Sequence, residues 1–400
     1  MTPTIKSQNL ADTPRTSGPY FSLDAWRGVA SLWVLGFHAA DQFHPKHAVV
    51  PLNVLYTLMS FGNRGVQLFF VISGFCILSA AVANLNRDKN PIGYLKARIR
   101  RIYPTYWAAL ILTLLLALAI AFLAHHGYLS QSHLAERLPN SHQAPLFWLS
   151  NFTLTTPLFH QIDLIDPAWT LCYEVAFYVI VGLALWGVIS RRQEEETLLL
   201  ALHGLTLLCL LALLLLPTPP PFPFDLWPQF GLGIVVYDAI KFPHRGRARL
   251  MLLLSGFAIL ALSSLKPYEV IGGHRVYIFP SFAICWIFAV LLIWLHRHDK
   301  RLVKSAPLRP LFAVGAFSYS LYITHVLNVG TMHQLMTKLH LSSAGYPYLL
   351  FFLTVVSAIG FAWAFYLVFE RPFISKRRQQ IVQTIHHVPM EPLLPVKEIS

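Results

Sequence analysis

Long apolar windows, each close to twenty residues, recur along the whole chain of 400 residues. A helix needs about twenty apolar residues to cross the hydrocarbon core of a bilayer, since each residue advances it by about 1.5 Å. The stretch 143–167 is only partly apolar and predicts a re-entrant or interfacial segment. The remaining pattern predicts an all-α integral membrane protein with about ten transmembrane helices, near residues 23–42, 61–83, 101–124, 168–190, 197–216, 224–240, 249–265, 277–296, 311–336 and 346–370.

Lys and Arg residues are distributed unevenly over the segments that join these windows. With a cytoplasmic N-terminus, 25 of the 31 fall on the cytoplasmic side and 6 outside. Because cytoplasmic loops of membrane proteins are enriched in Lys and Arg, we expect an even number of helices and two cytoplasmic termini. The expected organisation is a polar tail (1–20), one membrane domain (21–372) and a second tail (373–400).

Composition supports a membrane protein, with 55% hydrophobic residues, 12% charged residues and a mean hydropathy of +0.53. A soluble domain has about 25% charged residues. The first twenty residues lack the apolar core of a signal peptide, so we expect the first apolar window to be retained. The net charge of +13 is explained by topology and by affinity for an anionic lipid bilayer. We expect no nucleic-acid partner, because the basic residues are dispersed and no binding module is visible.

Two ionisable residues, Arg27 and His38, lie within the first apolar window. Eleven helical steps place them about 16 Å apart along the axis, with Arg27 near one membrane face and His38 near the midplane. A charged side chain at that depth costs about 2.5–3.5 kcal/mol on insertion scales, so such residues are candidate functional residues. Glu174, about two turns inside the fourth window, needs a buried partner, and His38 and Arg27 are the candidates. The alternative for Glu174 is a purely structural ion pair.

The segment that enters the third window carries Arg98, Arg101 and Tyr103. Arg98 and Arg101 are three residues apart, which places them on one face of a helix. One interpretation is a positive-inside anchor with an aromatic belt. The other is a phosphate clamp, because the guanidinium group binds phosphate through two parallel hydrogen bonds.

Three further residues, Ser73, Tyr322 and His325, are weaker site candidates. Ser73 precedes Gly74, and such a small-residue pair also allows close helix packing. His325 is a second intramembrane histidine, for which a hydrogen-bonded core position is the alternative. Glu370 and Arg371 are interpreted as the inner membrane boundary, with Pro372 ending the helix.

Metal binding is not expected. The external histidines His125, His126, His133, His142 and His160 match no zinc spacing. The four cysteines, Cys76, Cys172, Cys209 and Cys285, fall inside predicted helices and imply no disulfide framework.

Together these segments resemble the acyltransferase-3 family of bacterial multi-pass membrane O-acyltransferases over about residues 20–373. Thr170 stands where that family commonly has Ser. We expect no fused extracellular esterase-like domain of the kind that some members carry. The resemblance is carried by Arg27 and His38, Phe69-Phe-Val-Ile-Ser-Gly-Phe75, Arg98-x-x-Arg101 with Tyr103-Pro104-x-Tyr106, Trp169-Thr-Leu-x-x-Glu174, Ser318-Tyr-Ser-Leu-Tyr-Ile-Thr-His325 and Glu370-Arg-Pro372.

The resemblance implies that acetyl-CoA is the acyl donor inside the cell. The implied acceptor is a hydroxyl of a glycan or lipid-linked sugar outside it, and the implied location is the bacterial inner membrane. His38, Arg27 and Glu174 would be catalytic, and Arg98, Arg101 and Tyr103 would bind coenzyme A. A homo-oligomer is left open. The alternatives are a proton-coupled transporter, with Arg, His and Glu as a relay, and a membrane scaffold without activity.

Overall fold

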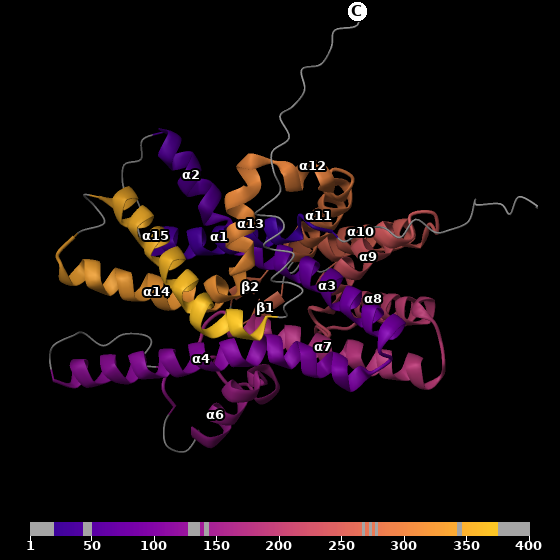
Figure 1. Ribbon diagram of the computed structural model, residues 1–400, viewed down its shortest axis with the longest axis horizontal. Helices are drawn as coiled ribbons and strands as arrows, with labels where there is room; N and C mark the ends of the chain where they lie inside the picture. Colours follow the sequence, from indigo (N-terminus) through magenta and orange to yellow (C-terminus); the bar gives the residue numbers. More distant parts are fainter. Residues whose placement is uncertain are drawn as a thin grey trace, which may run out of the picture.

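A computed structural model describes residues 20–42, 50–126, 137–139, 144–265, 269–271, 274–276, 279–341 and 346–374, nearly all of them helical (Figure 1). The expected tails, 1–20 and 373–400, lie almost entirely outside these residues, as do His133 and His142. The helices are α1 Leu23–Gln42, α2 Val50–Ser60, α3 Gly65–Arg87, α4 Pro91–His125, α6 Ala144–Thr153, α7 Ala168–Ser190, α8 Glu195–Leu215, α9 Trp227–Lys241, α10 Arg247–Leu265, α11 Phe279–His296, α12 Asp299–Lys304, α13 Arg309–Ala316, α14 Ser318–Lys338 and α15 Pro347–Phe365.

Each predicted window corresponds to a helix or to a bent helix pair. Among the described residues, 7 helices are long and apolar enough to cross a membrane, or 8 if the bent pair α13 and α14 is one span. Two predicted windows do not reach the length or hydropathy of a spanning helix. Helix α1 is too polar because of Asp24, Arg27 and His38, and α9 has only 15 residues. The structure is therefore that of a multi-pass helical membrane protein, and the count of ten stays a prediction.

The structure adds detail to the sequence prediction at four places. Helix α2 precedes the second window and was not predicted, and the partly apolar stretch 143–167 contains the short helix α6. The three-residue strands β1 Glu269–Ile271 and β2 His274–Val276 form an antiparallel hairpin that was not predicted, within a fold that is otherwise helical as expected. The window 311–336 is not one helix, because α13 and α14 meet at an angle of 73°.

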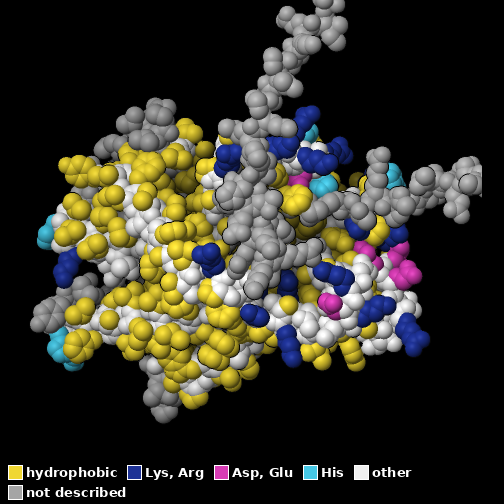
Figure 2. Space-filling model, viewed as in Figure 1, with side chains coloured by type: hydrophobic (Ala, Val, Ile, Leu, Met, Phe, Trp, Pro, Cys, Tyr) yellow, Lys and Arg dark blue, Asp and Glu magenta, His cyan; other side chains and the backbone are white. Residues whose placement is uncertain are grey.

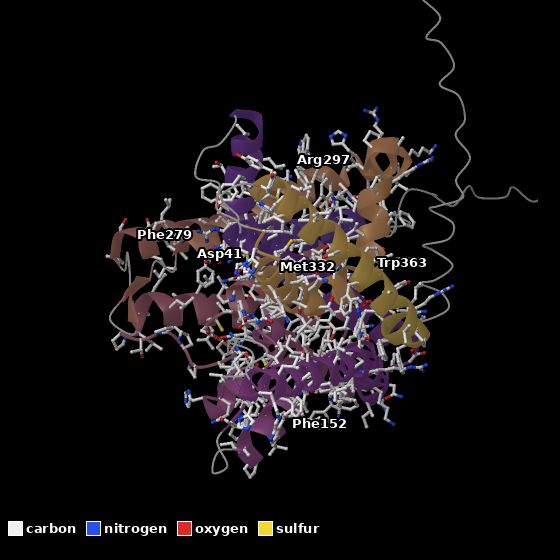
Figure 3. All side chains as sticks on the ribbon, turned by 90° about the vertical axis from the view of Figure 1, so that its left-hand side faces the viewer. Asp41, Phe152, Phe279, Arg297, Met332 and Trp363 are labelled. Atoms are coloured by element: carbon white, nitrogen blue, oxygen red, sulfur yellow. The ribbon has the colours of Figure 1, made fainter. Side chains whose placement is uncertain are left out.

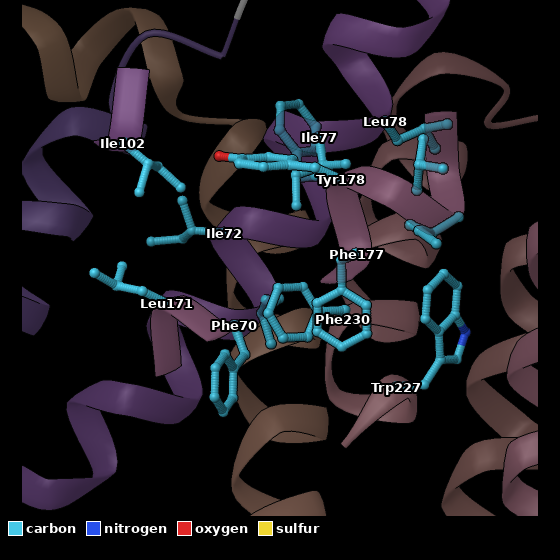
Figure 4. Close-up of a cluster of buried hydrophobic side chains, with 14 of the residues drawn as sticks. Phe70, Ile72, Ile77, Leu78, Ile102, Leu171, Phe177, Tyr178, Trp227 and Phe230 are labelled. Atoms are coloured by element: carbon cyan, nitrogen blue, oxygen red, sulfur yellow. The ribbon is translucent and has the colours of Figure 1, made fainter. Parts of the chain in front are cut away.

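The main core lies where α3, α7 and α9 meet (Figure 4). Aromatic rings fill its centre: Phe230 of α9 contacts Phe70 at 4.8 Å and Phe177 at 3.6 Å between ring centroids. Phe177 in turn lies 5.0 Å from Trp227. Large hydrophobic side chains on the outside remain exposed, and they dominate the left half of the face shown in Figure 2. A surface of this kind is expected to contact lipid.

Glycines allow two helix crossings at backbone contact. A Cβ atom on Gly233 of α9 would lie 2.1 Å from the carbonyl oxygen of Val71, and one on Gly74 of α3 would lie 2.1 Å from that of Phe230. The small pair Ser73–Gly74 thus packs as the sequence predicted. Helix α1 crosses α13 in the same way, since a Cβ on Gly315 would lie 1.8 Å from the carbonyl oxygen of Asp24.

The N-terminus of α1 is held from the other end of the chain. The buried carboxylate of Asp299 accepts hydrogen bonds from the backbone N–H groups of Phe21, at 3.0 Å, and Ser22, at 2.8 Å. The hydroxyl of Tyr20 donates to the carbonyl of Leu292 at 2.8 Å. The bonds to Asp299 satisfy backbone N–H groups at the start of the helix, which have no partners within the helix.

The first prediction concerns topology. Reporter fusions after Ser190 and after Ser400 are expected to report the cytoplasm, because the excess of Lys and Arg retains those segments inside. A fusion after His126 serves as the external control. A periplasmic signal at either of the first two positions would show that the helix count is wrong.

The second prediction concerns the α3–α9 crossing. Gly233→Ala is expected to lower the free energy of unfolding by about 1–3 kcal/mol, because the added methyl group meets backbone atoms that cannot move aside. The matched control is Gly204→Ala, where the methyl group meets nothing within 4 Å. Thermal unfolding of the purified proteins is the measurement, and equal midpoints for the two variants would contradict the prediction.

Candidate active site

A central cavity lies at the junction of α1, α3, α4, α7 and α14. Its volume is about 60 Å³. Because one water-sized group needs roughly 10–15 Å³ on this measure, the cavity has room for a few such groups. It is lined by Arg27, Val66, Phe69, Phe70, Ser73, Arg101, Ile102, Thr170, Leu171, Glu174, Phe230, Ser318, Tyr319 and Tyr322.

Arg27, Arg101 and Glu174 meet in this cavity, as three charges inside an apolar protein must. Arg27 is buried, 3.6 Å from the carboxylate of Asp24, and its Nη2 lies 3.8 Å from Cys76 Sγ. The carboxylate of Glu174 accepts a hydrogen bond of 2.6 Å from the hydroxyl of Tyr178. Of the two partners expected for Glu174, Arg27 lines the cavity with it.

Arg98 and Arg101 do not line the same space. Arg101 lines the central cavity, whereas Arg98 lines an open cleft of about 540 Å³ between the end of α3 and the start of α4. We call this second space the hairpin cleft; Asn84, Arg87 and Asn90 also line it. Within the described residues, Arg98 Nε is buried without a hydrogen-bond partner. The two arginines therefore line different spaces, and the phosphate clamp expected from their three-residue spacing stays a prediction.

Tyr103 does not line the cavity. Its hydroxyl donates to the carbonyl of Thr153 at 2.8 Å. Tyr106 and Trp107 donate in the same way, at 2.6 Å to Asn151 and at 3.0 Å to Phe152. These three side chains thus bind the C-terminal end of α6 to α4.

Glu370, interpreted from the sequence as a membrane boundary, lies inside the protein and contacts the helix that lines the cavity. The residue is buried, and its Oε2 accepts from the backbone N–H of Ser320 at 3.1 Å and from the Ser320 hydroxyl at 2.6 Å. A carboxylate is favourable at a helix N-terminus, where backbone N–H groups lack partners. Glu370 therefore holds the start of α14, from which Ser318 and Tyr319 line the cavity.

Tyr322 and His325 continue this face of α14. The hydroxyls of Tyr322 and Thr170 are 2.9 Å apart. His325 Nδ1 lies 2.7 Å from the carbonyl oxygen of Tyr322, which can only accept, so Nδ1 carries the proton. In the neutral ring, Nε2 then carries no proton and can accept a hydrogen bond through its lone pair. It is buried and has no hydrogen-bond partner in the part of the chain that the structure describes.

His38 packs against His325. Their ring centroids are 5.0 Å apart at an angle of 52°. His38 does not line the central cavity, and no hydrogen bond joins it to Glu174 within the described ranges. The structure thus pairs the two histidines of the sequence analysis with each other.

A third space, the distal pocket, lies beyond the histidine pair and has a volume of about 270 Å³. Segments that line the central cavity also line this pocket farther along. On α1, Arg27 lines the central cavity and Gln42 lines the distal pocket. On α14, Tyr322 lines the central cavity and Val326 lines the distal pocket. Its lining is Gln42, Thr113, Leu116, Ile120, Arg137, Leu164, Ile165, Asp166, Val326, Leu327, Gly330, Thr331, His333 and Gln334.

The loop before α7 carries two acids beside this pocket. Asp166 forms an ion pair with Arg137, whose second nitrogen donates to the carbonyl of Asp163 at 3.0 Å. Burial raises the pKa of Asp163 to about 6; Asp166 adds to the rise, whereas the hydrogen bond from Thr156 and the charge of Arg137 oppose it.

The described residues contain no group of three or more His, Cys, Asp or Glu side chains placed to hold a metal ion. The four cysteines are free thiols inside helices, as expected.

Comparison with known proteins gives the family. The sequence model of a protein family described as an acyltransferase domain matches residues 20–367. The exopolysaccharide production protein ExoZ of Rhizobium meliloti is 25% identical over 80% of this chain and 92% of its own length. The O-acetyltransferase OatA of Staphylococcus aureus is 22% identical over 76% of this chain, and the match covers 49% of OatA. No solved structure matches the chain significantly.

The match of the family model extends over most of the membrane domain and includes every segment that lines the central cavity. It favours an acyltransferase over the transporter and the scaffold that the sequence left as alternatives. This chain belongs to the acyltransferase-3 family of membrane acyltransferases.

Proposed function

We propose that the protein moves an acetyl group from cytoplasmic acetyl-CoA to a hydroxyl of an extracytoplasmic glycan or lipid-linked sugar, in the bacterial inner membrane. One observation carries the proposal. The central cavity and the distal pocket lie on opposite sides of the His38–His325 contact, and α1, α4, α7 with its preceding loop, and α14 line both. A donor can thus approach the histidines from one side and an acceptor from the other.

The distribution of Lys and Arg supports the orientation. The hairpin cleft, with Arg87 and Arg98, belongs to the basic segment between α3 and α4. In Figure 2 the Lys and Arg side chains gather over one half of the visible face, and the other half is mainly apolar. By the positive-inside rule the cleft opens to the cytoplasm and the distal pocket to the outside.

The hairpin cleft and the central cavity together suit a donor that is an anion and carries a small acyl group. Coenzyme A bears several phosphates, which Arg98 at the cleft and Arg101 in the cavity can bind through their guanidinium groups. The size of the central cavity suits an acetyl group rather than a long chain. Arg27 would face the thioester oxygen and stabilise the negative charge that develops there.

In the proposed reaction the acceptor oxygen attacks the thioester carbonyl carbon while its proton passes to His38. The carbon–sulfur bond then breaks, and the coenzyme A thiolate leaves and takes up that proton. The bare Nε2 of His325 can accept an N–H of His38, which would fix its tautomer and orientation. A covalent acetyl-histidine at His38 is the rival role.

Two relatives support the acceptor class, one named for exopolysaccharide production and the other for O-acetyl transfer. Among the sequence-predicted cofactor contacts, Tyr103 takes a structural role in this proposal, since its hydroxyl is bound to Thr153.

The third prediction concerns the donor. Arg101→Ala is expected to weaken acetyl-CoA binding by about 10- to 100-fold, because a hydrogen bond to a charged group contributes about 1.5–3 kcal/mol. Arg98→Ala should weaken it as well, and Arg101→Lys should retain part of the binding. The matched control is Arg100→Ala, an exposed position on the same helix turn. If Arg98→Ala and Arg101→Ala both bind acetyl-CoA with the parental affinity, these residues only set the membrane topology and do not bind the donor.

The fourth prediction concerns His38. His38→Ala is expected to lower the rate of acetyl transfer by at least about 100-fold at saturating acceptor, the usual contribution of a general base. His340→Ala, at the exposed end of α14, is the control and should retain the parental rate. Near-parental turnover by folded His38→Ala protein would exclude both roles of His38. A trapped acetyl-protein that disappears in this variant would favour the covalent role.

A further inference from the structure

The distal pocket contains polar chemistry that the transfer step does not use. Its polar side chains come from α1, α4, α14 and the loops on either side of α6: Gln42, Thr113, Arg137, Asp166, Thr331, His333 and Gln334. We infer that this pocket binds one neutral sugar unit of the acceptor through its hydroxyl groups. The inference rests on the proposed function and names the part of the acceptor that the enzyme recognises.

The charges of the pocket favour a neutral ligand. Arg137 is already paired with Asp166 and bonded to the carbonyl of Asp163. The other ionisable group in the lining is His333. An anion that bound Arg137 would have to compete with Asp166 and with the carbonyl of Asp163 for the guanidinium group. The lining of the central cavity differs, since it contains the two arginines Arg27 and Arg101 and one carboxylate, Glu174.

The hydrogen-bonding capacity of the pocket fits sugar hydroxyls. Gln42 and Gln334 are half-buried, and their amides have no hydrogen-bond partner within the described ranges. Each amide offers two donors and one acceptor, and a sugar hydroxyl can both donate and accept. The volume of about 270 Å³ is just below the range of about 300–1,000 Å³ usual for ligand pockets, which suits one ring rather than a longer glycan.

The position of the pocket suits the reaction. Gln42 lies four residues after His38 and therefore on the same face of α1. On α14, Val326 of the pocket directly follows His325. Figure 3 views this end of the molecule, and Asp41 and Met332, the neighbours of Gln42 and Thr331, lie near the middle of it. A ring in the pocket would thus hold a hydroxyl next to the histidine pair.

The fifth prediction tests the pocket without turnover. Thr331→Cys places a thiol in the exposed lining, and a membrane-impermeant maleimide should label it from outside intact cells. With purified protein in a detergent that has no sugar headgroup, glucose, galactose, mannose or N-acetylglucosamine is added. At about 50 mM, twice a Kd of about 25 mM for a weak site, at least one sugar should slow labelling roughly threefold.

The control variant is Gln161→Cys, which places a thiol outside the pocket lining, and no sugar should slow its labelling. Labelling of the parent protein is subtracted to correct for the native cysteines. The inference is overturned if none of the four sugars protects Thr331→Cys, or if that thiol is labelled only from the cytoplasm. Protection by a fatty acid alone would also overturn it and would make the pocket a site for an acyl chain.

Kinetics separate this inference from the proposed function. Gln42→Leu and Gln334→Leu should each raise the acceptor KM by about 2- to 12-fold, the effect of losing one neutral hydrogen bond, and leave the acetyl-CoA KM unchanged. Gln161→Leu is the matched control and should change neither constant. An unchanged acceptor KM in both variants would contradict the inference. Sugar protection together with full activity of His38→Ala would instead contradict the proposed mechanism and leave the sugar site intact.

Discussion

The hydrogen bonds between Glu370 and Ser320 fix the start of α14, and the candidate site depends on that start. After the 73° bend, α14 begins inside the protein, where its first N–H groups have no water to bind. The carboxylate of Glu370 supplies an acceptor there. From that point the helix carries Tyr322 to the central cavity and His325 to the contact with His38. A shift of α14 by one turn, about 5.4 Å, would break every one of these contacts.

The cost of charge in a membrane explains why the polar groups gather along one interior line. Arg27, Arg101 and Glu174 line the same small cavity, so that opposite charges offset one another away from lipid. The histidine pair follows, and beyond it the ion pair of Arg137 and Asp166. Under the proposed function, this line is also the route of the acetyl group. Donor and acceptor meet at the histidines, and no continuous water channel is needed.

Several features could be predicted because they depend on local pattern. Apolar length located the helical segments, and the pair Ser73–Gly74 indicated the close crossing of α3 and α9. The ordered motifs indicated the family, which the match over residues 20–367 confirms. A three-residue spacing places Arg98 and Arg101 on one helix face but does not specify which neighbours cover it, so the sequence did not indicate that they line different spaces. The bend before Ser318 was missed because hydropathy does not register a break inside an apolar window.

The sequence by itself determined the class of the protein, the approximate position of its helices, the excess of basic charge on one side and the residue types available for chemistry. These properties follow from transfer free energies and from spacing along one helix. Only the tertiary structure decided that His38 meets His325, that Glu370 holds α14, and that two cavities flank the histidines. Such contacts join residues hundreds of positions apart, and they arise from the packing of helices that periodicity cannot orient.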